Sequence, residues 1–484
     1  MKRNSIQGSL WLWLYRFLHS RRIRVRGCHQ LSDFYDLFSG LPQGSVLAPL
    51  LFIIYINDLI PLVKSSLCEI LLFADDISLF PSSYGDDKLH FSTLQTALTA
   101  VSTWASLWHI TFSTSKTATI VFTKKRRSLL PHLPSLILQS KSVQYQPHYK
   151  YLGVILEQDG KSNLHCKHII NKLHYHKYNI SRLCGRHLRL PPLVVRKLVE
   201  CIMVTRITYG LPFFHPNLTH IHKINSILSS SLSSSLHLRG HPHHHSISFE
   251  LNLPSFYTLR DLELIRFHSR ILHLPLTHPS RLLFQREQLM LLDDPSQFLI
   301  SDIYPLFWCK VLQVSDIWQV HLPLPPDRIR VHTRSQIINE WHSDNRGKLL
   351  KSVYTHPSTL PSSTPLYLSH DTPKIACIRA RLRFDRTTLS NRLSKYSPLH
   401  PNYCLFCYTH THIRVCDDPQ HLLLHCPQFN PHRHLLLHQL SNYHLLPSLS
   451  IILGCVDHLQ PHLQLPILKI THSFLSDISA LRRI

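Results

Sequence analysis

Two adjacent acidic residues, Asp75 and Asp76, interrupt an apolar stretch that reads LLFADDISLF. The short apolar segments on either side, residues 70–73 and 77–80, are typical of two strands joined by a tight turn. Two like charges beside apolar residues are unfavourable unless a cation neutralises them. The pattern therefore predicts a β-hairpin whose tip either binds a divalent cation, for which Mg²⁺ suits hard carboxylate oxygens, or is an ordinary Asp-containing turn.

The segments around this hairpin predict a mixture of helices and strands. Apolar residues recur at helical spacing over residues 89–108, and a short helix is expected at 10–18. After the loop SGLPQGS, another helix should begin with Ser45 as its cap and run toward Asp58. The segments RIRVRG, ATIVFTKK and YKYLGVILEQDGK are each expected to form a strand. This order predicts an α+β domain over residues 1–160, built on an antiparallel sheet with helices.

Beyond residue 160 the pattern becomes mostly helical. The segment ILSSSLSSSLHLRG fits either a serine-rich linker or a thin amphipathic helix, because its leucines lie four residues apart. The segment HPHHHS at 241–246 is either a metal site or a solvated loop, and no carboxylate or cysteine beside it in the sequence completes a metal site. A Pro/Ser/Thr-rich linker is predicted at 351–374, between a helical region at 161–350 and a C-terminal region at 375–484.

The chain is strongly basic, since 52 Lys and Arg residues outnumber 28 Asp and Glu residues and give a formal net charge of +24. Such a balance indicates a polyanionic partner, either nucleic acid or an anionic membrane surface, unless it is only a compositional bias. No secretory signal is evident, and the longest apolar run, VLAPLLFIIYI, is too short to span a bilayer. We therefore expect a soluble intracellular protein, nuclear or cytoplasmic, with no membrane partner.

Four of the 12 cysteines cluster in the segment CLFCYTHTHIRVCDDPQHLLLHC, whereas the others are scattered singly and are expected to be reduced. Cys404 and Cys407 form a Cys-x2-Cys pair, and His421 and Cys426 follow at a spacing that suits a tetrahedral structural Zn²⁺ site. The alternative is four unligated cysteines. Residues that could compete as ligands are Cys416, His410, His412 and His425. Nearby arginines that either contact phosphates or form a solvated face are Arg379, Arg381, Arg383 and Arg386.

Four motifs occur in order within the first 160 residues: SGLPQGSVLAPLLFIIYINDL, LLFADDISLF, the lysine-bearing WHITFSTSKTATIVF, and YKYLGVIL. Together they resemble the reverse transcriptases of non-LTR (LINE-type) retrotransposons. The cysteine cluster, with ARLRFDRTTLSNRL upstream and DDPQHLLLHCPQF at its end, resembles the zinc motif near the carboxyl end of many of these proteins. The resemblance implies a partial reverse-transcriptase palm, a helical thumb-like region that includes residues 164–290, and a small zinc-knuckle-like module.

The resemblance also implies a role for each matched residue. Asp75 and Asp76 match the catalytic hairpin, with Asp75 the direct ligand of both Mg²⁺ ions. Lys116 matches a palm lysine near the triphosphate, and Ser113 stands where these proteins usually have Asn. The residues that match the segment supporting the primer end are Tyr151, Leu152 and Gly153. The residues that match the loop against the incoming nucleotide and the template are Gly40, Pro42, Gln43, Gly44 and Ser45.

The reaction implied by the resemblance is RNA-directed DNA polymerisation by two-metal phosphoryl transfer, with an RNA template, a DNA primer and deoxynucleoside triphosphates. It also needs a bridging Asp on a strand upstream of the PQGS loop, and only Asp33 and Asp36 precede that loop here. We therefore expect a polymerase fragment, truncated on its N-terminal side, with an incomplete two-ion Mg²⁺ site and impaired activity, unless Asp33 or Asp36 substitutes. The alternatives are a non-catalytic nucleic-acid-binding remnant and an intron-encoded maturase.

Overall fold

The structure is a computed structural model in which the chain forms two compact units. One is Met1–Tyr151 with Leu156–Gly160, and the other is Leu152–Ile155 with Lys161–Ile484. The described residues are 6–27, 30–82, 87–123, 133–184, 190–214, 216–238, 240, 242–278, 280–282, 285, 326–354, 360–397, 399–482 and 484. Parts of the sequence predictions that lie outside them include Cys28, Cys309, residues 124–125 of the predicted strand ATIVFTKK, His241 of HPHHHS, residues 355–359 of the predicted linker, and most of residues 283–325 in the predicted helical region.

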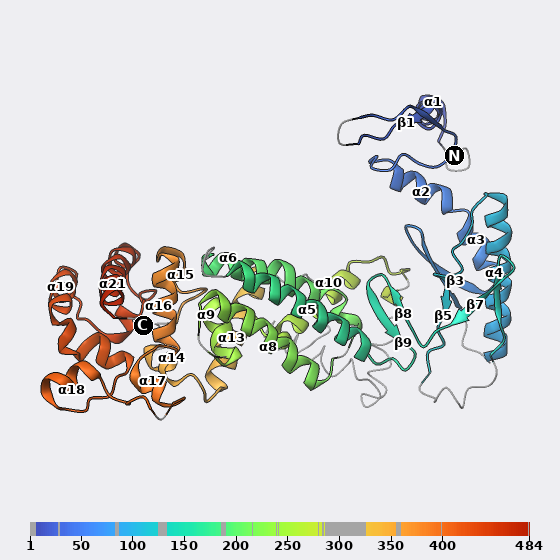
Figure 1. The fold of residues 1–484 in the computed structure, drawn as a ribbon. Coiled ribbons are helices and arrows are strands. Elements are labelled where there is room, and N and C mark those ends of the chain that lie inside the picture. The colour runs from blue at the N-terminus through green and yellow to red at the C-terminus, as the bar shows by residue number, and fades with distance from the viewer. Residues whose placement is uncertain are drawn as a thin grey trace. The chain divides into compact units, whose positions relative to one another are not determined.

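The N-terminal unit mixes short strands with helices (Figure 1). The helices predicted at 10–18 and 89–108 are confirmed as α1 and α4. The elements in chain order are α1 (Gly8–Leu18), β1 (Arg21–Ile23), β2 (Tyr35–Leu37), α2 (Ala48–Ile56), α3 (Leu59–Lys64), β3 (Cys68–Phe73), β4 (Asp76–Pro81), α4 (Asp87–Leu107), β5 (Ala118–Thr119), β6 (Leu136–Leu138), β7 (Lys141–Tyr145), β8 (His148–Tyr151) and β9 (Val154–Glu157). The mixed helix and sheet content agrees with the predicted α+β class.

The strands that the structure describes pair in several small sheets, and not in the single antiparallel sheet predicted from the sequence. β1–β2, β3–β4 and β8–β9 are two-stranded, whereas β5, β7 and β6 form a three-stranded sheet. Within that sheet β6 and β7 are antiparallel, but β5 pairs with β7 in parallel. The β6–β7 hairpin was not predicted, because its turn residues Gln139 and Ser140 adopt positive φ angles of 46° and 63° without the Gly or Asn that usually marks such a turn.

Helix α4 supplies much of the core of the N-terminal unit. Its residues Val101 and Trp104 are buried with Leu59 of α3 and with apolar side chains of β3 and β6. The carboxamide of Gln95 accepts a hydrogen bond from the Ile137 amide (2.8 Å) and donates one to the Ile137 carbonyl (3.1 Å). This pair of hydrogen bonds satisfies both backbone groups of Ile137 and holds β6 beside the helix.

The described part of the C-terminal unit is mainly helical, as predicted (Figure 1). It includes two π-helical turns, η3 and η8, and two 3₁₀ turns, η4 and η9. The elements are α5 (Asn163–Leu183), α6 (Pro192–Leu198), η3 (Val199–Val204), α7 (Thr205–Thr208), η4 (Leu211–Phe213), α8 (Leu218–Ser235), α9 (His244–Leu251), α10 (Phe256–Leu272), α13 (Pro326–Ser343), α14 (Lys348–Val353), α15 (Tyr367–His370), α16 (Pro373–Arg383), α17 (Ser390–Ser394), α18 (Leu405–Thr411), η8 (His421–His425), η9 (Pro427–Phe429), α19 (Asn430–Ser441), α20 (Leu449–Ile452) and α21 (Pro461–Leu481).

The serine-rich segment belongs to α8, so the helix interpretation of ILSSSLSSSLHLRG is confirmed and the linker interpretation is wrong. Leu228 and Leu232 are buried in the core on one face. The buried serines satisfy their hydroxyls within the helix, as Ser229 does by donating to the Asn225 carbonyl (2.6 Å) and Ser233 to the Ser229 carbonyl (2.7 Å). A run of serines can therefore pack inside the unit without leaving polar groups unpaired.

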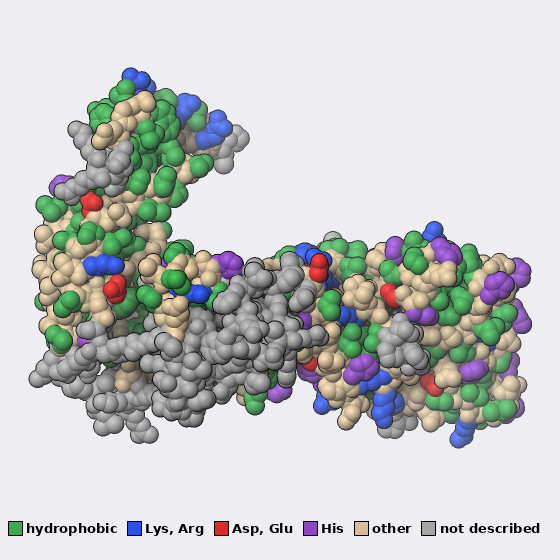
Figure 2. Space-filling model, turned by 180° about the vertical axis from the view of Figure 1, so that it is seen from behind, with side chains coloured by type: hydrophobic (Ala, Val, Ile, Leu, Met, Phe, Trp, Pro, Cys, Tyr) green, Lys and Arg blue, Asp and Glu red, His purple; other side chains and the backbone are tan. Residues whose placement is uncertain are grey.

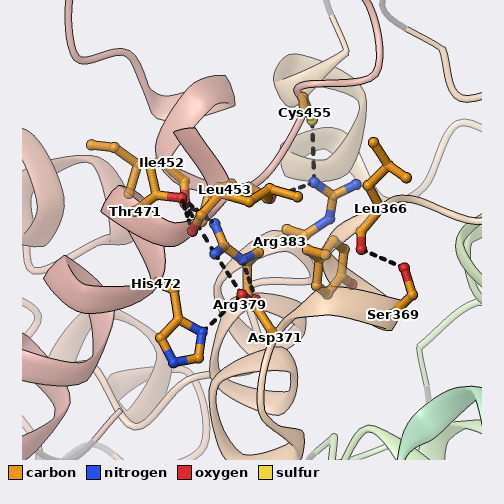
Figure 3. A network of polar contacts seen from close by, with 12 residues as sticks. Leu366, Ser369, Asp371, Arg379, Arg383, Ile452, Leu453, Cys455, Thr471 and His472 are labelled. Carbon is orange, nitrogen blue, oxygen red and sulfur yellow. Dashed lines mark hydrogen bonds and ion pairs between the residues drawn. The ribbon is translucent and has the colours of Figure 1, made fainter. Parts of the chain in front are cut away.

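One hydrophobic core extends through the C-terminal unit, from Cys166 in α5 to Ile484. Figure 3 shows Arg379 and Arg383 of α16 within this core, close to Asp371, Thr471 and Cys455. Both arginine side chains are fully buried, and each forms an ion pair with a buried carboxylate. The expectation that these two arginines contact phosphates or form a solvated face is therefore wrong, because Asp371 and Glu250 neutralise them inside the fold.

Histidine, hydrophobic and charged side chains are interspersed over the face of the C-terminal unit that Figure 2 shows. Within the predicted linker at 351–374, the described residues include buried Tyr354 and Tyr367 and the short helix α15. None of the helices that the structure describes combines the length and apolar character needed to cross a membrane.

Candidate active-site hairpin and candidate metal centre

Strands β3 and β4 form the predicted hairpin around the two acidic residues. They pair in antiparallel register from Cys68 opposite Pro81 to Phe73 opposite Asp76. Ala74, in the turn, adopts a positive φ of 53°. The structure places Asp75 and Asp76 at the exposed end of the hairpin, so water solvates both carboxylates and no burial penalty opposes their charge. This position makes both side chains accessible to a cation and to a substrate.

The predicted nucleotide-binding loop lies between β2 and α2. Gly40 and Gly44 have φ angles of +77° and +84°, a region that favours glycine. Arg21 donates hydrogen bonds to the Ser39 carbonyl (3.2 Å) and the Gly40 carbonyl (2.6 Å), which hold the start of the loop. Ser45 does not cap α2 as predicted: its hydroxyl accepts from the Leu47 amide (3.2 Å), and the helix begins at Ala48.

Lys116 lies in a turn that follows α4, and its side chain is exposed. The Ser113 carbonyl accepts hydrogen bonds from the amides of Lys116 and Thr117 (both 3.1 Å), so the turn forms with serine at this position. Tyr149 of β8 donates its hydroxyl proton to the Lys116 carbonyl at 2.6 Å. These contacts fix the backbone of the turn and leave the ammonium group free to approach a polyanion.

Among the predicted primer-supporting residues, Tyr151 ends β8, and Leu152 and Gly153 form the turn to β9. The sequence predicted one continuous strand here, which is wrong, because Leu152 and Gly153 adopt φ angles of +46° and +86° and reverse the chain. Tyr209 donates a hydrogen bond of 2.5 Å to the Leu152 carbonyl. A Cβ atom on Gly153 would lie only 3.0 Å from Cε1 of Tyr209, so the close approach of this ring requires glycine.

The described residues place no third ligand beside the acidic pair. Among them, no group of three or more His, Cys, Asp or Glu side chains close enough to share an ion includes Asp75 or Asp76. Asp33 and Asp36 are exposed, and Asp36 lies on β2 opposite Arg22. The structure therefore offers two hard oxygen ligands at the hairpin, without a bridging carboxylate from the residues that it describes.

The C-terminal unit brings Cys404, Cys407, His421 and Cys426 into one buried cluster, with one ligand atom of each within 4.8 Å of the others. The Sγ atoms of Cys404 and Cys426 are 3.9 Å apart, and Cys407 Sγ lies 3.4 Å from His421 Nε2. With Zn–S bonds of about 2.3 Å and Zn–N bonds of about 2.0 Å, the edges of a tetrahedral site are roughly 3.8 Å and 3.5 Å. The cluster therefore has the dimensions of a zinc site.

Local structure and charge support this cluster. Cys404 precedes α18, Cys407 lies one turn into it, and His421 begins η8, where its amide donates to Asp418 (2.8 Å). Arg482 lies 3.9 Å from Cys404 Sγ, so its cation is placed to compensate thiolate charge. The pKa of Cys407 is raised to about 12, mainly by burial. Burial also lowers the pKa of His421, which favours a neutral imidazole.

The competing ligands predicted from the sequence lie outside the cluster. Cys416 is exposed and pairs through its backbone with Tyr403 in an isolated bridge. The histidines that are exposed and take no part in the cluster are His410, His412 and His425. Spacing alone left these alternatives open, because all of them are close in sequence. The tertiary structure distinguishes them, because only Cys404, Cys407, His421 and Cys426 point into one buried space.

Residues 2–156 match the family model for reverse transcriptase (RNA-dependent DNA polymerase). The chain is 31% identical over 166 residues to a probable RNA-directed DNA polymerase from transposon X-element of Drosophila melanogaster. The match covers 33% of this chain and 17% of that protein. It is also similar to RNA-directed DNA polymerases from mobile element jockey. The D. melanogaster protein is 24% identical, and the match covers 46% of this chain and 24% of that protein. The Drosophila funebris protein is 26% identical, and the match covers 48% of this chain and 25% of that protein.

The paired carboxylates on a β-hairpin and the family match identify residues 2–156 as reverse-transcriptase sequence. The relatives narrow the type, since the chain is similar to RNA-directed DNA polymerases of non-LTR retrotransposons, as its motifs predicted. The chain spans a quarter or less of the length of these curated relatives.

Proposed function

We propose that the β3–β4 hairpin is the catalytic hairpin of an RNA-directed DNA polymerase, with Asp75 and Asp76 as ligands of Mg²⁺. The observation that carries this proposal is the position of both carboxylates, exposed at the end of a paired hairpin within the segment that matches reverse transcriptases. Accessible carboxylate oxygens fit Mg²⁺, which retains waters and binds substrate phosphates. When bound, Mg²⁺ lowers the pKa of a primer 3′-hydroxyl and neutralises charge on the pyrophosphate.

The neighbouring segments fit the other substrates of this reaction. The loop with Gly40, Pro42, Gln43, Gly44 and Ser45 allows a nucleotide and an RNA template to approach the backbone closely. The turn at Lys116 fixes the backbone and exposes an ammonium group, which is suited to triphosphate charge. The proposed support for the end of a DNA primer consists of Tyr151, at the end of β8, and the turn residues Leu152 and Gly153.

We further propose that the 484-residue chain by itself binds Mg²⁺ weakly and extends primers poorly. Two-metal catalysis requires a carboxylate that bridges both ions, and the residues that the structure describes place none beside Asp75 and Asp76. Two carboxylates hold Mg²⁺ less firmly than three, since charge and ligand count set the affinity of such sites. A third carboxylate from another polypeptide segment would complete the site.

The second candidate function is nucleic-acid binding without catalysis, which the net charge of +24 favours. Both candidates bind single strands through phosphates, so the affinity should fall with salt at a log–log slope of about −0.7 for each contact. Only a complete palm gains affinity for a primer–template from a matched deoxynucleoside triphosphate with Mg²⁺. We expect that gain to stay below about tenfold, or 1.4 kcal/mol, and a larger gain would favour a complete enzyme site.

We also propose that Cys404, Cys407, His421 and Cys426 hold one structural Zn²⁺. Three thiolates and one imidazole fill the four positions of a tetrahedral ion, which leaves no open position for catalysis. The site carries a net charge of −1 when loaded, which nearby Arg482 offsets. Zinc would tie α18 to the η8–η9 segment inside the core of the C-terminal unit.

Binding of Mn²⁺, a paramagnetic substitute for Mg²⁺, tests the proposed hairpin site directly. Electron paramagnetic resonance should detect a weak site in the wild-type chain that disappears in Asp75→Asn and in Asp76→Asn. Asp58→Asn is the matched control, because Asp58 is another exposed carboxylate of the same unit that makes no side-chain capping bond. Retention of the weak site in both hairpin variants would contradict the assignment.

A further inference from the structure

Three consecutive histidines meet two carboxylates where α9 packs against α13. His243 caps α9, and His244 and His245 begin it. One ring nitrogen from each histidine lies within 4.8 Å of the others. The sequence left a metal site and a solvated loop as alternatives for HPHHHS, because no carboxylate lies beside it in the chain. The fold brings in Glu340, from the last turns of α13, and Asp344, directly after that helix.

Each carboxylate directs one oxygen at the histidine rings. Glu340 Oε2 lies 3.6 Å from His245 Nδ1, and Asp344 Oδ2 is in contact with His243 Nδ1. All four of these atoms are buried, and among the residues that the structure describes none of the four makes a hydrogen bond. The Asp344 side chain is only 9% exposed. Buried polar atoms without hydrogen bonds are rare, and a bound ion is one partner that satisfies them.

The other oxygen of each carboxylate is anchored by the protein. Glu340 Oε1 accepts hydrogen bonds from the hydroxyls of Ser255 (2.8 Å) and Thr258 (3.3 Å), at the start of α10. Asp344 Oδ1 accepts one from the Arg346 amide (3.1 Å). Metal-binding side chains are commonly held in this way, with one atom fixed by a neighbouring group and the other directed at the ion. The two carboxylates are therefore oriented toward the rings before any ion binds.

Charged residues also lie close to the rings. Glu340 and Asp344 bring two carboxylates to the three rings, and Arg346 and Lys348, which line the neighbouring cavity, offset part of their charge. His243 and His244 line a cavity of about 580 Å³, which gives an ion a route to the cluster.

We propose that His243, His244 and His245, with one oxygen each from Glu340 and Asp344, bind a late first-row divalent metal ion, with zinc as the natural occupant. Imidazole nitrogens and carboxylate oxygens are suitable ligands for zinc, nickel and copper. Neighbouring nitrogen ligands of a zinc ion lie about 3.3 Å apart. The ring nitrogens lie within 4.8 Å of one another, so small side-chain rotations bring them to binding distance. The ion would link the start of α9 to the end of α13. This proposed site does not depend on the polymerase proposal.

The test is the zinc content of the full chain, purified without a polyhistidine tag and dialysed against zinc-free buffer. Elemental analysis should give two zinc ions for each wild-type chain, one for the double variant His244→Asn/His245→Asn, and one for Cys404→Ser. His222→Asn is the matched control, because His222 lines the same cavity outside the cluster, and it should retain two. A wild-type chain with a single zinc that Cys404→Ser removes would overturn the proposal.

A second measurement, made on the wild-type chain, tests the proposal even if the variants fail to fold. X-ray absorption at the zinc edge of the wild-type chain reports the average ligand set of all bound zinc. Two sites should give a mixture of sulfur with a majority of nitrogen and oxygen neighbours, whereas the cysteine site alone gives three sulfur ligands to one nitrogen. Glu340→Gln should lower the occupancy of the histidine site, with the content of secondary structure as a check. A spectrum dominated by sulfur at full loading would contradict the proposal.

Discussion

Arg383 and Glu250 form an ion pair of 2.7 Å between Nε and Oε1, with both side chains fully buried. A second contact, from Arg383 Nη2 to Glu250 Oε2, measures 3.0 Å. Tyr367 donates a hydrogen bond of 2.5 Å to Glu250, and Arg383 donates one of 2.8 Å to the Leu453 carbonyl. These contacts join α9 to α16 and to the segment before α21, so the region that contains the cysteine cluster shares its interior with the preceding helices.

Glu250→Gln should destabilise the C-terminal unit strongly. The change leaves the buried Arg383 guanidinium without its counter-charge, and breaking one side of a buried pair costs about 3–5 kcal/mol. Denaturant unfolding measures the loss. Glu200→Gln is the control, because Glu200 pairs with Arg196 and Lys197 at the surface, where the expected loss is below about 1 kcal/mol. Similar losses in both variants would mean that the buried pair contributes no more than a surface pair.

Gly153→Ala should disrupt the turn between β8 and β9. Alanine at a positive φ costs about 1–2 kcal/mol, and its Cβ would also press on the Tyr209 ring at 3.0 Å. Gly160→Ala separates these two effects, since Gly160 has a φ of +70° with nothing near its added Cβ. Hydrogen exchange of the β8–β9 amides should accelerate in Gly153→Ala and much less in Gly160→Ala. Equal acceleration would show that the contact with Tyr209 does not matter.

Stability should decrease as the pH falls below about 6.5. Among the described residues, every histidine with a clearly shifted pKa is shifted downward, mainly by burial: His176, His243, His244, His332 and His421. A lowered folded-state pKa means that the unfolded chain binds more protons below its own pKa near 6.5, so the stability present above that pH is lost as the pH falls toward the lowered values.

His176→Gln tests this pH dependence in the helical part of the chain. The substitution should flatten the fall in denaturant midpoint between pH 7 and pH 5, because it removes one of the groups whose pKa partial burial lowers. The control is His174→Gln, since His174 is an exposed residue of the same helix, α5. An unchanged pH profile in His176→Gln, or an equally flattened one in His174→Gln, would contradict the prediction.

Arg482→Gln should weaken zinc binding at the cysteine cluster. Its guanidinium lies 3.9 Å from Cys404 Sγ and also bonds Asp417 at 2.6 Å, and loss of a supporting group around a metal site lowers affinity roughly 10–100-fold. Competition with a zinc-binding dye measures the change. Arg414→Gln provides the comparison, because Arg414 is exposed and its guanidinium stacks on the rings of Tyr403 and Tyr408. An unchanged zinc affinity in Arg482→Gln would show that Arg482 does not support zinc binding at the cluster.

The features that the sequence predicted well depend on local pattern. The hairpin follows from two short apolar segments around Asp75 and Asp76, and α4 follows from apolar residues at helical spacing. Cys404 and Cys407 are brought together by one helical turn, so their spacing alone indicated a shared ligand site. In each case the residues that determine the structure lie within about 20 positions of one another.

The features that the sequence did not predict depend on contacts between remote residues. Glu250 and Arg383 are 133 positions apart, and nothing near Arg383 in the chain indicates that it is buried. His245 and Glu340 meet only because α9 packs beside α13. The turn at Gln139 and Ser140 has positive φ angles on residues that seldom adopt them, so that hairpin lacks the glycine or asparagine that usually marks such a turn.

Primer extension on an RNA template tests the central claim most directly, namely that the Asp75–Asp76 pair is a polymerase metal site that needs a further carboxylate. With Mg²⁺ or Mn²⁺, we expect the wild-type chain to extend a DNA primer little or no better than Asp75→Asn. Asp58→Asn again controls for the loss of an exposed carboxylate. Robust extension by the wild-type chain that disappears in Asp75→Asn and persists in Asp58→Asn would contradict the claim, because it would require a complete two-metal site within these 484 residues.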